Sequence, residues 1–171
     1  MYQLTNWLGI QIKLLNEFAK LPTRGSEQAA GYDLYAATDG PVRIPAHRTI
    51  LIGTGLSMAL PQGTFLGIYP RSGLASKQGL RPANCVGVID SDYRGEIKIA
   101  LHNDTDNDKD IMAGERIAQG ILHSYIPMTF EVVDELDTTE RGERRIWKYR
   151  EIKFQKELFI AGLEEKRNQI I

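Results

Sequence analysis

The stretch Gly87-Val88-Ile89-Asp90-Ser91-Asp92-Tyr93-Arg94-Gly95 places two carboxylates and a phenol on a short polar turn between two apolar runs, Cys85–Ile89 and Glu96–Leu101. Two β-type runs on either side of a polar turn that ends in glycine predict a β-hairpin. A hairpin holds polar side chains at fixed angles, and its strand backbones offer N–H and C=O groups to a ligand. The two carboxylates and the phenol of this turn are therefore candidate functional groups.

Short β-type runs extend over most of the chain. With Gly or Pro in many of the turns between them, they occupy Ile10–Leu14, Thr49–Leu60, Thr64–Tyr69, Arg116–Tyr125 and Phe130–Val133. Only Gly73–Gln78 has the pattern of a helical turn in this part of the chain. Frequent turns between short strands predict an all-β fold, either a distorted barrel or a jelly roll.

The composition changes near residue 142. Residues 1–142 hold 15 of the 16 glycines and all seven prolines, with 13 basic and 17 acidic residues. Residues 143–171 hold 8 basic and 5 acidic residues, and Phe154, Leu158 and Ala161 recur there at helical spacing. The sequence thus predicts a β-domain over 1–142 and an atypical basic tail, helical or disordered, over 143–171.

Charge and hydropathy exclude several classes of function. The 171 residues carry a net charge of −1, which gives no electrostatic reason to expect nucleic acid or a membrane surface as a partner. No apolar run approaches the roughly 18 residues of a membrane span, and the N-terminus lacks a signal-peptide pattern, so a cytoplasmic location is expected. The single cysteine, Cys85, is expected to be a buried, inert thiol, and His47, His102 and His123 show no metal-ligand spacing.

Three further segments carry candidate functional residues. Asp33 lies between aromatic residues in Ala30–Ala37. Pro70-Arg71-Ser72-Gly73-Leu74-Ala75 combines a planar guanidinium with the start of a helical turn, and both features bind anions. Gly114-Glu115-Arg116-Ile117-Ala118-Gln119 follows. Taken singly, these segments are also compatible with solvated turns and edge strands.

In chain order, Ala30–Ala37, Pro70–Ala75, Gly87–Gly95 and Gly114–Gln119 resemble the first, second, third and fourth motifs of the trimeric dUTP diphosphatases (dUTPases), and the resemblance covers about residues 10–142. The resemblance implies the dUTPase-like jelly roll, or β-clip, and a homotrimer with sites at subunit interfaces. It implies hydrolysis of dUTP to dUMP and pyrophosphate, which keeps uracil out of DNA. The implied cofactor is Mg²⁺, held by the triphosphate and by water rather than by direct protein ligands, with Asp33 and Gln119 contacting those water molecules.

The resemblance also implies roles for individual residues. Asp90 fixes the attacking water as the catalytic base, and Asp33 is the second catalytic carboxylate. Tyr93 packs under the deoxyribose and leaves no room for a 2′-hydroxyl. The uracil slot is implied to consist of Asn84, Val88, Ile89 and Lys98. The implied phosphate ligands are Arg71, Ser72, Gly73, Gln119 and Arg141, while Arg116 braces the site.

The chain departs from the family in the fifth, glycine-rich motif. Thr139-Glu140-Arg141-Gly142-Glu143 begins it, but Arg144–Arg150 follows where the family has Gly-Gly-Phe-Gly-Ser-Thr-Gly. If Gly-Gly-Phe-Gly-Ser-Thr-Gly is written with the synonymous codons GGA GGA TTT GGA AGT ACA GGG, one A inserted before them gives AGG AGG ATT TGG AAG TAC AGG, which encodes Arg-Arg-Ile-Trp-Lys-Tyr-Arg, the sequence of residues 144–150. We interpret the tail as an out-of-frame reading of this motif, and a genuine helical extension is the alternative.

Two other functions fit parts of the sequence. The dCTP deaminases share the fold, but Ala100 stands where their proton-shuttling glutamate would be, which disfavours deamination. The other alternative is a phage-type regulatory protein, which binds dUTP with impaired catalysis and acts through an unknown protein partner. Loss of the fifth motif favours such a regulator more than an intact motif would.

Overall fold

The computed structural model describes residues 9–140 and 142. It contains two units, Met1–Met128 and Thr129–Ile171, and each is described by itself. The predicted helical tail of residues 143–171 lies outside the described residues, and the predicted boundary at residue 142 stays a prediction.

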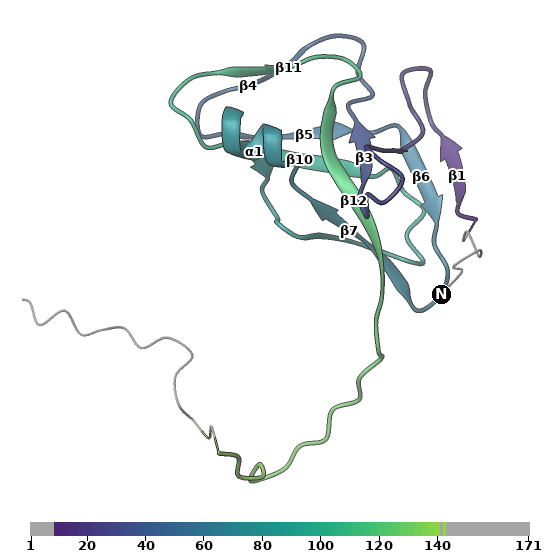
Figure 1. Ribbon diagram of the computed structural model, residues 1–171, viewed down its shortest axis with the longest axis vertical. Coiled ribbons are helices and arrows are strands. Elements are labelled where there is room, and N and C mark those ends of the chain that lie inside the picture. Colours follow the sequence, from purple (N-terminus) through teal and green to yellow (C-terminus); the bar gives the residue numbers. More distant parts are fainter. Residues whose placement is uncertain (1–8, 141, 143–171) are drawn as a thin grey trace, which may run out of the picture. The chain divides into compact units, whose positions relative to one another are not determined.

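The first unit is built almost entirely of short β-strands, as Figure 1 shows, and this confirms the predicted fold class. Its one described helix is α1 (Ser72–Gln78), close to the helical turn predicted at Gly73–Gln78. In chain order the strands are β1 (Gln11–Leu14), β2 (Thr23–Arg24), β3 (Tyr32–Tyr35), β4 (Val42–Ile44), β5 (Thr49–Gly53), β6 (Leu56–Ala59), β7 (Thr64–Tyr69), β8 (Leu80–Pro82), β9 (Gly87–Asp90), β10 (Lys98–Asn103), β11 (Lys109–Ile111) and β12 (Arg116–Ser124).

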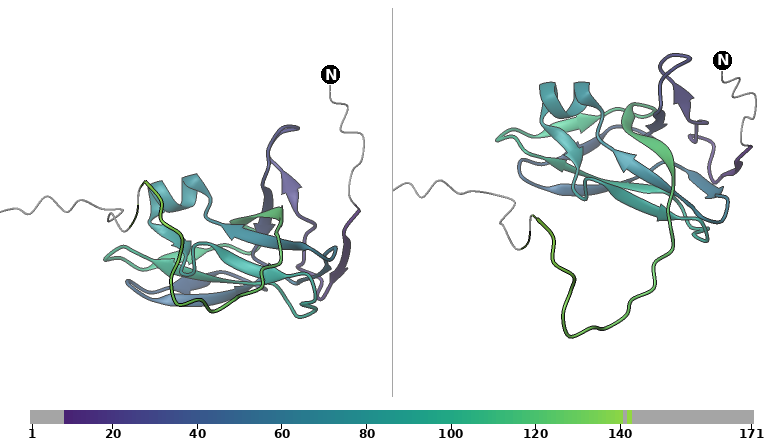
Figure 2. Two further views of the ribbon diagram at one scale, coloured as in Figure 1. Left: turned by 90° about the horizontal axis from the view of Figure 1, so that it is seen from below. Right: turned by 60° about the horizontal axis from the view of Figure 1, so that its bottom comes forward.

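The strands form small antiparallel sheets whose neighbours are distant in sequence. The largest sheet has the order β2-β3-β12-β7-β9, and a second has the order β5-β10-β8. Two strand pairs, β1-β6 and β11-β4, complete the described part of the fold. In Figure 2 the strands lie in layers, and α1 lies outside them. Because most pairings join segments that are distant in sequence, each sheet is held together by long-range contacts.

The core lies between these sheets and consists of aliphatic side chains. Strand β10 shows the alternation that builds it, because Ile99 and Leu101 are buried whereas Lys98 is exposed. Asn103 is a fully buried polar exception, and its Nδ2 donates to Ile44 O at 3.0 Å and Asn107 O at 2.8 Å. The remaining core residues include Leu34, Ile44, Ile52, Leu56, Leu66, Ile68, Leu80, Ile97, Ile111 and Ile117.

The predicted hairpin at residues 85–101 is wrong. Strand β9 pairs with β7, while β10 pairs with β5 and β8, so the two strands belong to different sheets. The segment after the turn is bound elsewhere, because Ser57 Oγ donates to Arg94 O at 2.7 Å and Ile97 N donates to Leu56 O at 2.8 Å. The turn therefore crosses from one sheet to the other.

Two other predictions also need correction. The run Thr49–Leu60 is divided between β5 and β6 at Gly55, whose φ of +64° is left-handed and favours glycine. The run Phe130–Val133, in the second unit, forms no strand, and its Phe130 and Val132 are 88% and 98% exposed, so no burial favours an extended pairing there.

Candidate functional site

Four predicted residues meet where β3, β7 and β12 approach the start of α1, and we call them the Asp33 cluster: Asp33, Arg71, Arg116 and Gln119. Asp33 Oδ1 accepts Arg71 Nε at 2.7 Å, and its Oδ2 accepts Arg116 Nη1 at 3.2 Å. The Asp33 side chain is 13% exposed, whereas Arg71 and Arg116 are 24% and 50% exposed. One half-buried carboxylate thus orients two guanidinium groups that still face solvent.

Gln119 joins this cluster through the strand register. It lies opposite Asp33 on β3 and opposite Tyr69 on β7, and its Nε2 donates to Pro70 O at 2.9 Å. A Cβ atom at Gly31 would collide with the Gln119 amide, so glycine is needed there for the amide to keep its place. Strand pairing and the space left by Gly31 therefore set the position of Gln119 on the face that carries Asp33.

Arg71, Ser72 and Gly73 connect β7 to α1. Arg71 is the N-cap of the helix and has extended backbone angles, with φ −90° and ψ 131°. Ser72 and Gly73 are exposed, and no heavy atom lies within 4 Å of a Cβ built at Gly73. This open surface beside the Arg71 guanidinium leaves room for an anionic ligand.

Most of the residues predicted for base and sugar binding line a second site, which we call the Val88 pocket. Its volume is about 270 Å³, and its lining residues are Leu51, Val88, Ile89, Asp90, Tyr93, Glu96 and Lys98. Val88 and Asp90 project from the same face of β9, because side chains two residues apart on a strand share a face. The structure thus brings together five of the predicted residues around one apolar wall.

Asn84 and Cys85 differ from the prediction. Asn84 is exposed in the bend before β9 and does not line the Val88 pocket, although its side chain lies beside Gly87. Cys85 is exposed rather than buried, and its Sγ donates to Pro82 O at 2.6 Å. Burial of Cys85 was predicted from the apolar pattern of residues 85–89, but β9 begins at Gly87, so Cys85 precedes the strand and is not covered by it.

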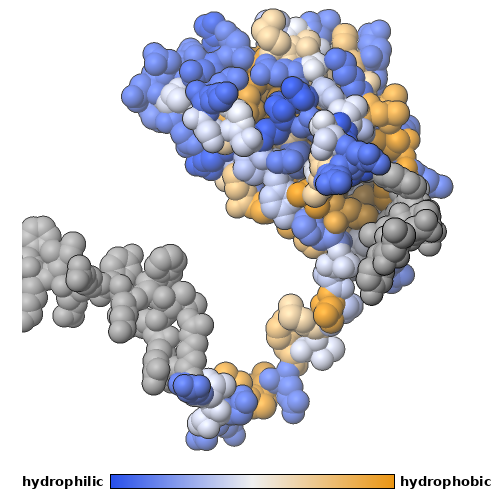
Figure 3. Space-filling model, viewed as in Figure 1, coloured by the Kyte–Doolittle hydropathy of each residue, from blue (hydrophilic) through white to orange (hydrophobic). Residues whose placement is uncertain are grey.

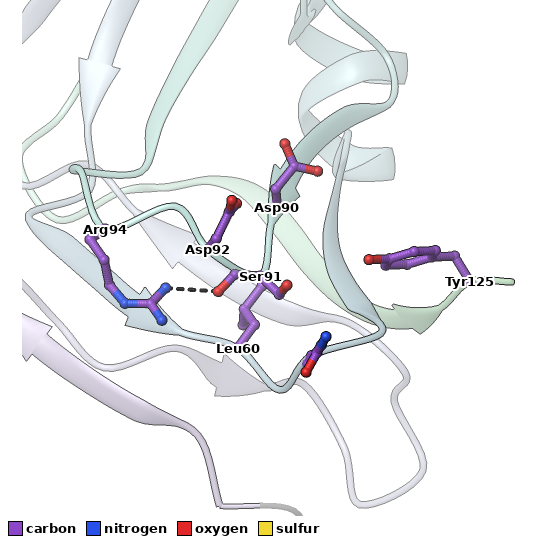
Figure 4. Close-up of a pocket in the computed structure, with 7 residues that line it drawn as sticks. Leu60, Asp90, Ser91, Asp92, Arg94 and Tyr125 are labelled. Carbon is purple, nitrogen blue, oxygen red and sulfur yellow. Dashed lines mark hydrogen bonds between the residues drawn. The ribbon is translucent and has the colours of Figure 1, made fainter. Parts of the chain in front are cut away.

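Asp90 is exposed in the single chain. It ends β9, which is the edge strand of its sheet, so no further strand covers it. Asp90 also borders a larger hollow of about 730 Å³, whose lining residues are Leu60, Gln62, Asp90, Ser91, Asp92, Arg94 and Tyr125. In Figure 4, Ser91 and Leu60 lie between Arg94 and Tyr125, and Arg94 donates to Ser91 O at 2.7 Å.

The Asp33 cluster and Asp90 lie on one face of the same sheet but far apart. The register places Asp33 opposite Gln119, Gln119 opposite Tyr69, and Phe65 opposite Asp90. Three strand spacings of about 4.8 Å and four residue steps of about 3.3 Å separate Asp33 from Asp90 by about 20 Å within one chain. One copy of the chain therefore cannot bring both groups to the same phosphorus atom.

Glu96 and Leu51 also line the Val88 pocket, and neither was predicted from the sequence. Leu51 reaches the pocket because β5 pairs with β10, and the side chain is 61% exposed. Glu96 could have been found, since it lies two residues before Lys98 and so on the same side of an extended segment. Apolar patches also interrupt the hydrophilic surface in Figure 3.

Arg141 and the segment that replaces the fifth motif lie outside the described residues. Within residues 9–140 and 142, no three His, Cys, Asp or Glu side chains converge on a position that could hold a metal ion. The described part of the chain also contains no helix long and apolar enough to cross a membrane.

Comparisons with known proteins agree on one family. The family model described as dUTPase matches residues 17–147. The deoxyuridine 5′-triphosphate nucleotidohydrolase of Yarrowia lipolytica is 47% identical over 137 residues, covering 79% of this chain and 85% of that protein. The corresponding protein of Corynebacterium glutamicum is 46% identical over 143 residues, covering 82% and 94%.

Solved structures are similar over the same region. The dUTPase of Staphylococcus bacteriophage 80alpha, solved with dUpNHpp, has a TM-score of 0.74 at 28% identity, covering 80% of this chain and 95% of that one. A mutant dUTPase of phage phi11 of S. aureus, whose structure shows the coordination of a structural Mg(II) ion, has a TM-score of 0.70 at 23% identity, covering 77% and 100%. The second of these likenesses supports the fold alone.

Proposed function

The chain belongs to the dUTPase family, and on that premise we propose that the Val88 pocket and the Asp33 cluster are two halves of its active site. The protein hydrolyses dUTP to dUMP and pyrophosphate. The observation that carries the assignment of residues is their placement: Asp90, Tyr93 and Lys98 share one pocket, and Asp33, Arg71 and Gln119 share one cluster. The match to dUTP nucleotidohydrolases favours hydrolysis over dCTP deamination and over a purely regulatory role.

Asp90 is the proposed general base. Its carboxylate accepts a proton from water while the water oxygen bonds to the α-phosphorus and the bond from that phosphorus to the bridging oxygen breaks. Pyrophosphate leaves, and no covalent intermediate with the protein is formed. The open position of Asp90 at the end of β9 leaves it accessible to a water molecule and a substrate. Asp33 supports the same reaction from the phosphate side.

The Val88 pocket is the proposed site for the nucleoside. Val88 and Ile89 supply an apolar wall and strand backbone for uracil, and Lys98 borders the same space. The Tyr93 ring lies against Gly95 and is 45% exposed, so it offers a flat face to a deoxyribose. Contact with that face leaves no space for a 2′-hydroxyl, which is the proposed reason for rejection of UTP. Asn84 is the proposed polar partner of the base from the adjoining bend.

The Asp33 cluster is the proposed site for the phosphates. A guanidinium has five N–H donors. Asp33 takes only the Nε donor of Arg71 directly, so donors remain for phosphate oxygens. Ser72, Gly73 and Gln119 adjoin Arg71 and are the proposed neighbouring ligands. Arg141 is proposed to join them from the C-terminal segment.

The donor set is suitable for a hydrated Mg²⁺ ion. Mg²⁺ dehydrates reluctantly and is usually bound by one or two carboxylates together with substrate phosphates. Asp33 retains acceptor capacity because each of its two oxygens accepts one hydrogen bond and carries a second lone pair. Asp33 and Gln119 would therefore contact the water molecules of the ion, which supplies positive charge to the triphosphate.

The separation of about 20 Å supports sites at the interfaces between copies of the chain, and membership of the dUTPase family makes a homotrimer the proposed assembly. A neighbouring copy would bring its Asp33 cluster to the Val88 pocket of the first, which one chain cannot do alone. Size-exclusion chromatography with light scattering is expected to give three chains per particle. A monomeric form that hydrolyses dUTP at the same specific activity as the trimer would contradict this arrangement.

The activity is tested by release of pyrophosphate from dUTP, UTP and dCTP. We expect hydrolysis of dUTP, little of UTP and no ammonia from dCTP. Asp90→Asn should lose turnover by at least about 10² while it still binds dUpNHpp, because the substitution removes the base and leaves the pocket lining in place. Full activity of Asp90→Asn would refute the base assignment, and equal turnover of dUTP and UTP would refute the role of Tyr93.

A further inference from the structure

The Glu96 side chain is fixed in place at the edge of the Val88 pocket. Its Oε1 accepts the backbone N–H of Gly55 at 3.0 Å, and its Oε2 lies 3.4 Å from Lys98 Nζ. Only 25% of the side chain is exposed. None of the roles assigned above uses this carboxylate, although it borders the space proposed for the nucleoside.

The corner between β5 and β6 is shaped to receive the carboxylate. A Cβ atom at Gly53 would collide with Glu96 Oε1, so a larger residue there would displace Glu96. Gly55 has a left-handed φ of +64°, and this conformation helps to expose its N–H to the carboxylate. Removal of the carboxylate would leave this half-buried N–H without the acceptor that it now has.

Glu96 is also bonded to Tyr93 through its backbone. Tyr93 Oη donates to Glu96 O at 3.1 Å, and the ring packs directly on Gly95. The position of the Tyr93 ring therefore depends on where the backbone of Glu96 lies. The Glu96 side chain holds that backbone to Gly55, and the neighbouring residues bond to β6 through Arg94 O and Ile97 N.

On the basis of the proposed function, we propose that Glu96 is a positioning residue that determines the preference for dUTP over UTP. Its side chain bonds the segment between β9 and β10 to Gly55. That segment in turn fixes the position of the Tyr93 ring relative to the sugar. Glu96 touches no reacting atom in this scheme. Its effect is on discrimination between the two sugars and on affinity, more than on the chemical step.

Substitutions of Glu96 distinguish two effects: the hydrogen bond that it accepts from Gly55 N–H, which we call the Gly55 clamp, and its ion pair with Lys98. In Glu96→Gln the amide oxygen still accepts the Gly55 N–H, but the ion pair with Lys98 is lost, so the preference for dUTP over UTP should stay within about fivefold of wild type. In Glu96→Ala the clamp is lost, and the preference should fall about tenfold or more, because small displacements of positioning groups are costly. Glu96→Asp is too short to reach Gly55 and should behave as Glu96→Ala does, without leaving a cavity.

The preference is measured as the ratio of kcat/KM for the two nucleotides, and independently as the ratio of Kd for dUpNHpp and its ribose counterpart. Asp108→Ala is the matched control, because Asp108 Oδ1 also accepts a backbone N–H, that of Ala46 at 3.1 Å, and lines neither half of the site. The control should unfold at a lower urea concentration than wild type and keep the preference unchanged.

Three results would overturn the proposal. An unchanged preference in both Glu96→Ala and Glu96→Asp would show that the clamp does not position Tyr93. An equal loss in Glu96→Gln and Glu96→Ala would assign the effect to the charge beside Lys98. Failure of the wild-type protein itself to prefer dUTP would instead refute the proposed role of Tyr93, on which the inference rests.

Discussion

Gly95→Ala is expected to impair recognition of dUTP while it leaves the stability of the protein nearly unchanged. A Cβ atom at position 95 would lie 2.6 Å from Tyr93 Cζ and 3.0 Å from its Cε2, and it would collide with the hydroxyl. Ordinary contact begins at 3.4 Å, so the ring has to retreat by about 0.8 Å or more. The backbone is not the obstacle, and a half-exposed side chain can move.

Two opposing effects make the change in stability small. Displacement of the ring breaks the exposed hydrogen bond from Tyr93 to Glu96, which contributes roughly 0.5–1 kcal/mol. Alanine lowers the conformational entropy of the unfolded chain and so stabilises the protein by about 0.4–1 kcal/mol where the native backbone permits it. The φ of Gly95 lies outside the left-handed region, so the second effect applies. The net change in the free energy of unfolding is expected to be within about 0.5 kcal/mol.

Recognition of the sugar should suffer far more. A displacement near 1 Å in a positioning group can lower a rate by about 10², so kcat/KM for dUTP should fall by roughly 10–100-fold. The preference over UTP should fall with it, because the ring no longer excludes the 2′-hydroxyl at the same height. Release of pyrophosphate from both nucleotides and the Kd for dUpNHpp give independent readouts.

Gly25→Ala is the control for this experiment. No heavy atom lies within 4 Å of a Cβ built at Gly25, so the substitution changes the backbone entropy without a collision. It should leave both nucleotide ratios unchanged. If Gly95→Ala retains the wild-type preference and the wild-type Kd, the ring of Tyr93 does not set the sugar specificity and the steric reasoning is wrong.

Three further predictions address other parts of the molecule. Asp33→Ala should lower the free energy of unfolding by about 2 kcal/mol, because Asp33 accepts two charge-assisted hydrogen bonds of which only that from Arg71 is well shielded from solvent, and an unchanged urea midpoint would contradict this. Asn103→Ala should cost about 3 kcal/mol in the same assay because it leaves several buried groups unpaired, whereas Asp106→Ala on the exposed surface should cost less than about 0.5 kcal/mol. Replacement of residues 144–150 by Gly-Gly-Phe-Gly-Ser-Thr-Gly, followed by a stop codon, should raise the turnover of dUTP by at least about 10², because the restored loop adds hydrogen-bond donors for the phosphates. Equal turnover of the original and the restored protein would refute the importance of that loop.

The local sequence was sufficient for some of the elements and for much of the site. Pattern and turn residues placed β7 at its observed bounds and α1 within one residue, because both depend on short-range alternation and on Gly and Pro at their ends. The order of the motifs identified Asp33, Arg71 and Gln119 as partners, and the structure brings them together on adjacent elements. The assigned roles of these residues remain predictions.

Tertiary structure decided the features that depend on long-range pairing. The turn at residues 91–95 looked like a hairpin because its flanks are both β-type, but the better partners of β9 and β10 lie elsewhere in the chain. The same pairing put Leu51 and Glu96 into the Val88 pocket and left Asp90 at a sheet edge. A residue's local sequence contains no information about which distant strand will bond to its own. The chain alone thus determined an all-β member of the dUTPase family with its chemical groups, whereas only the register showed that these groups lie about 20 Å apart in one chain, because strand order sets that distance.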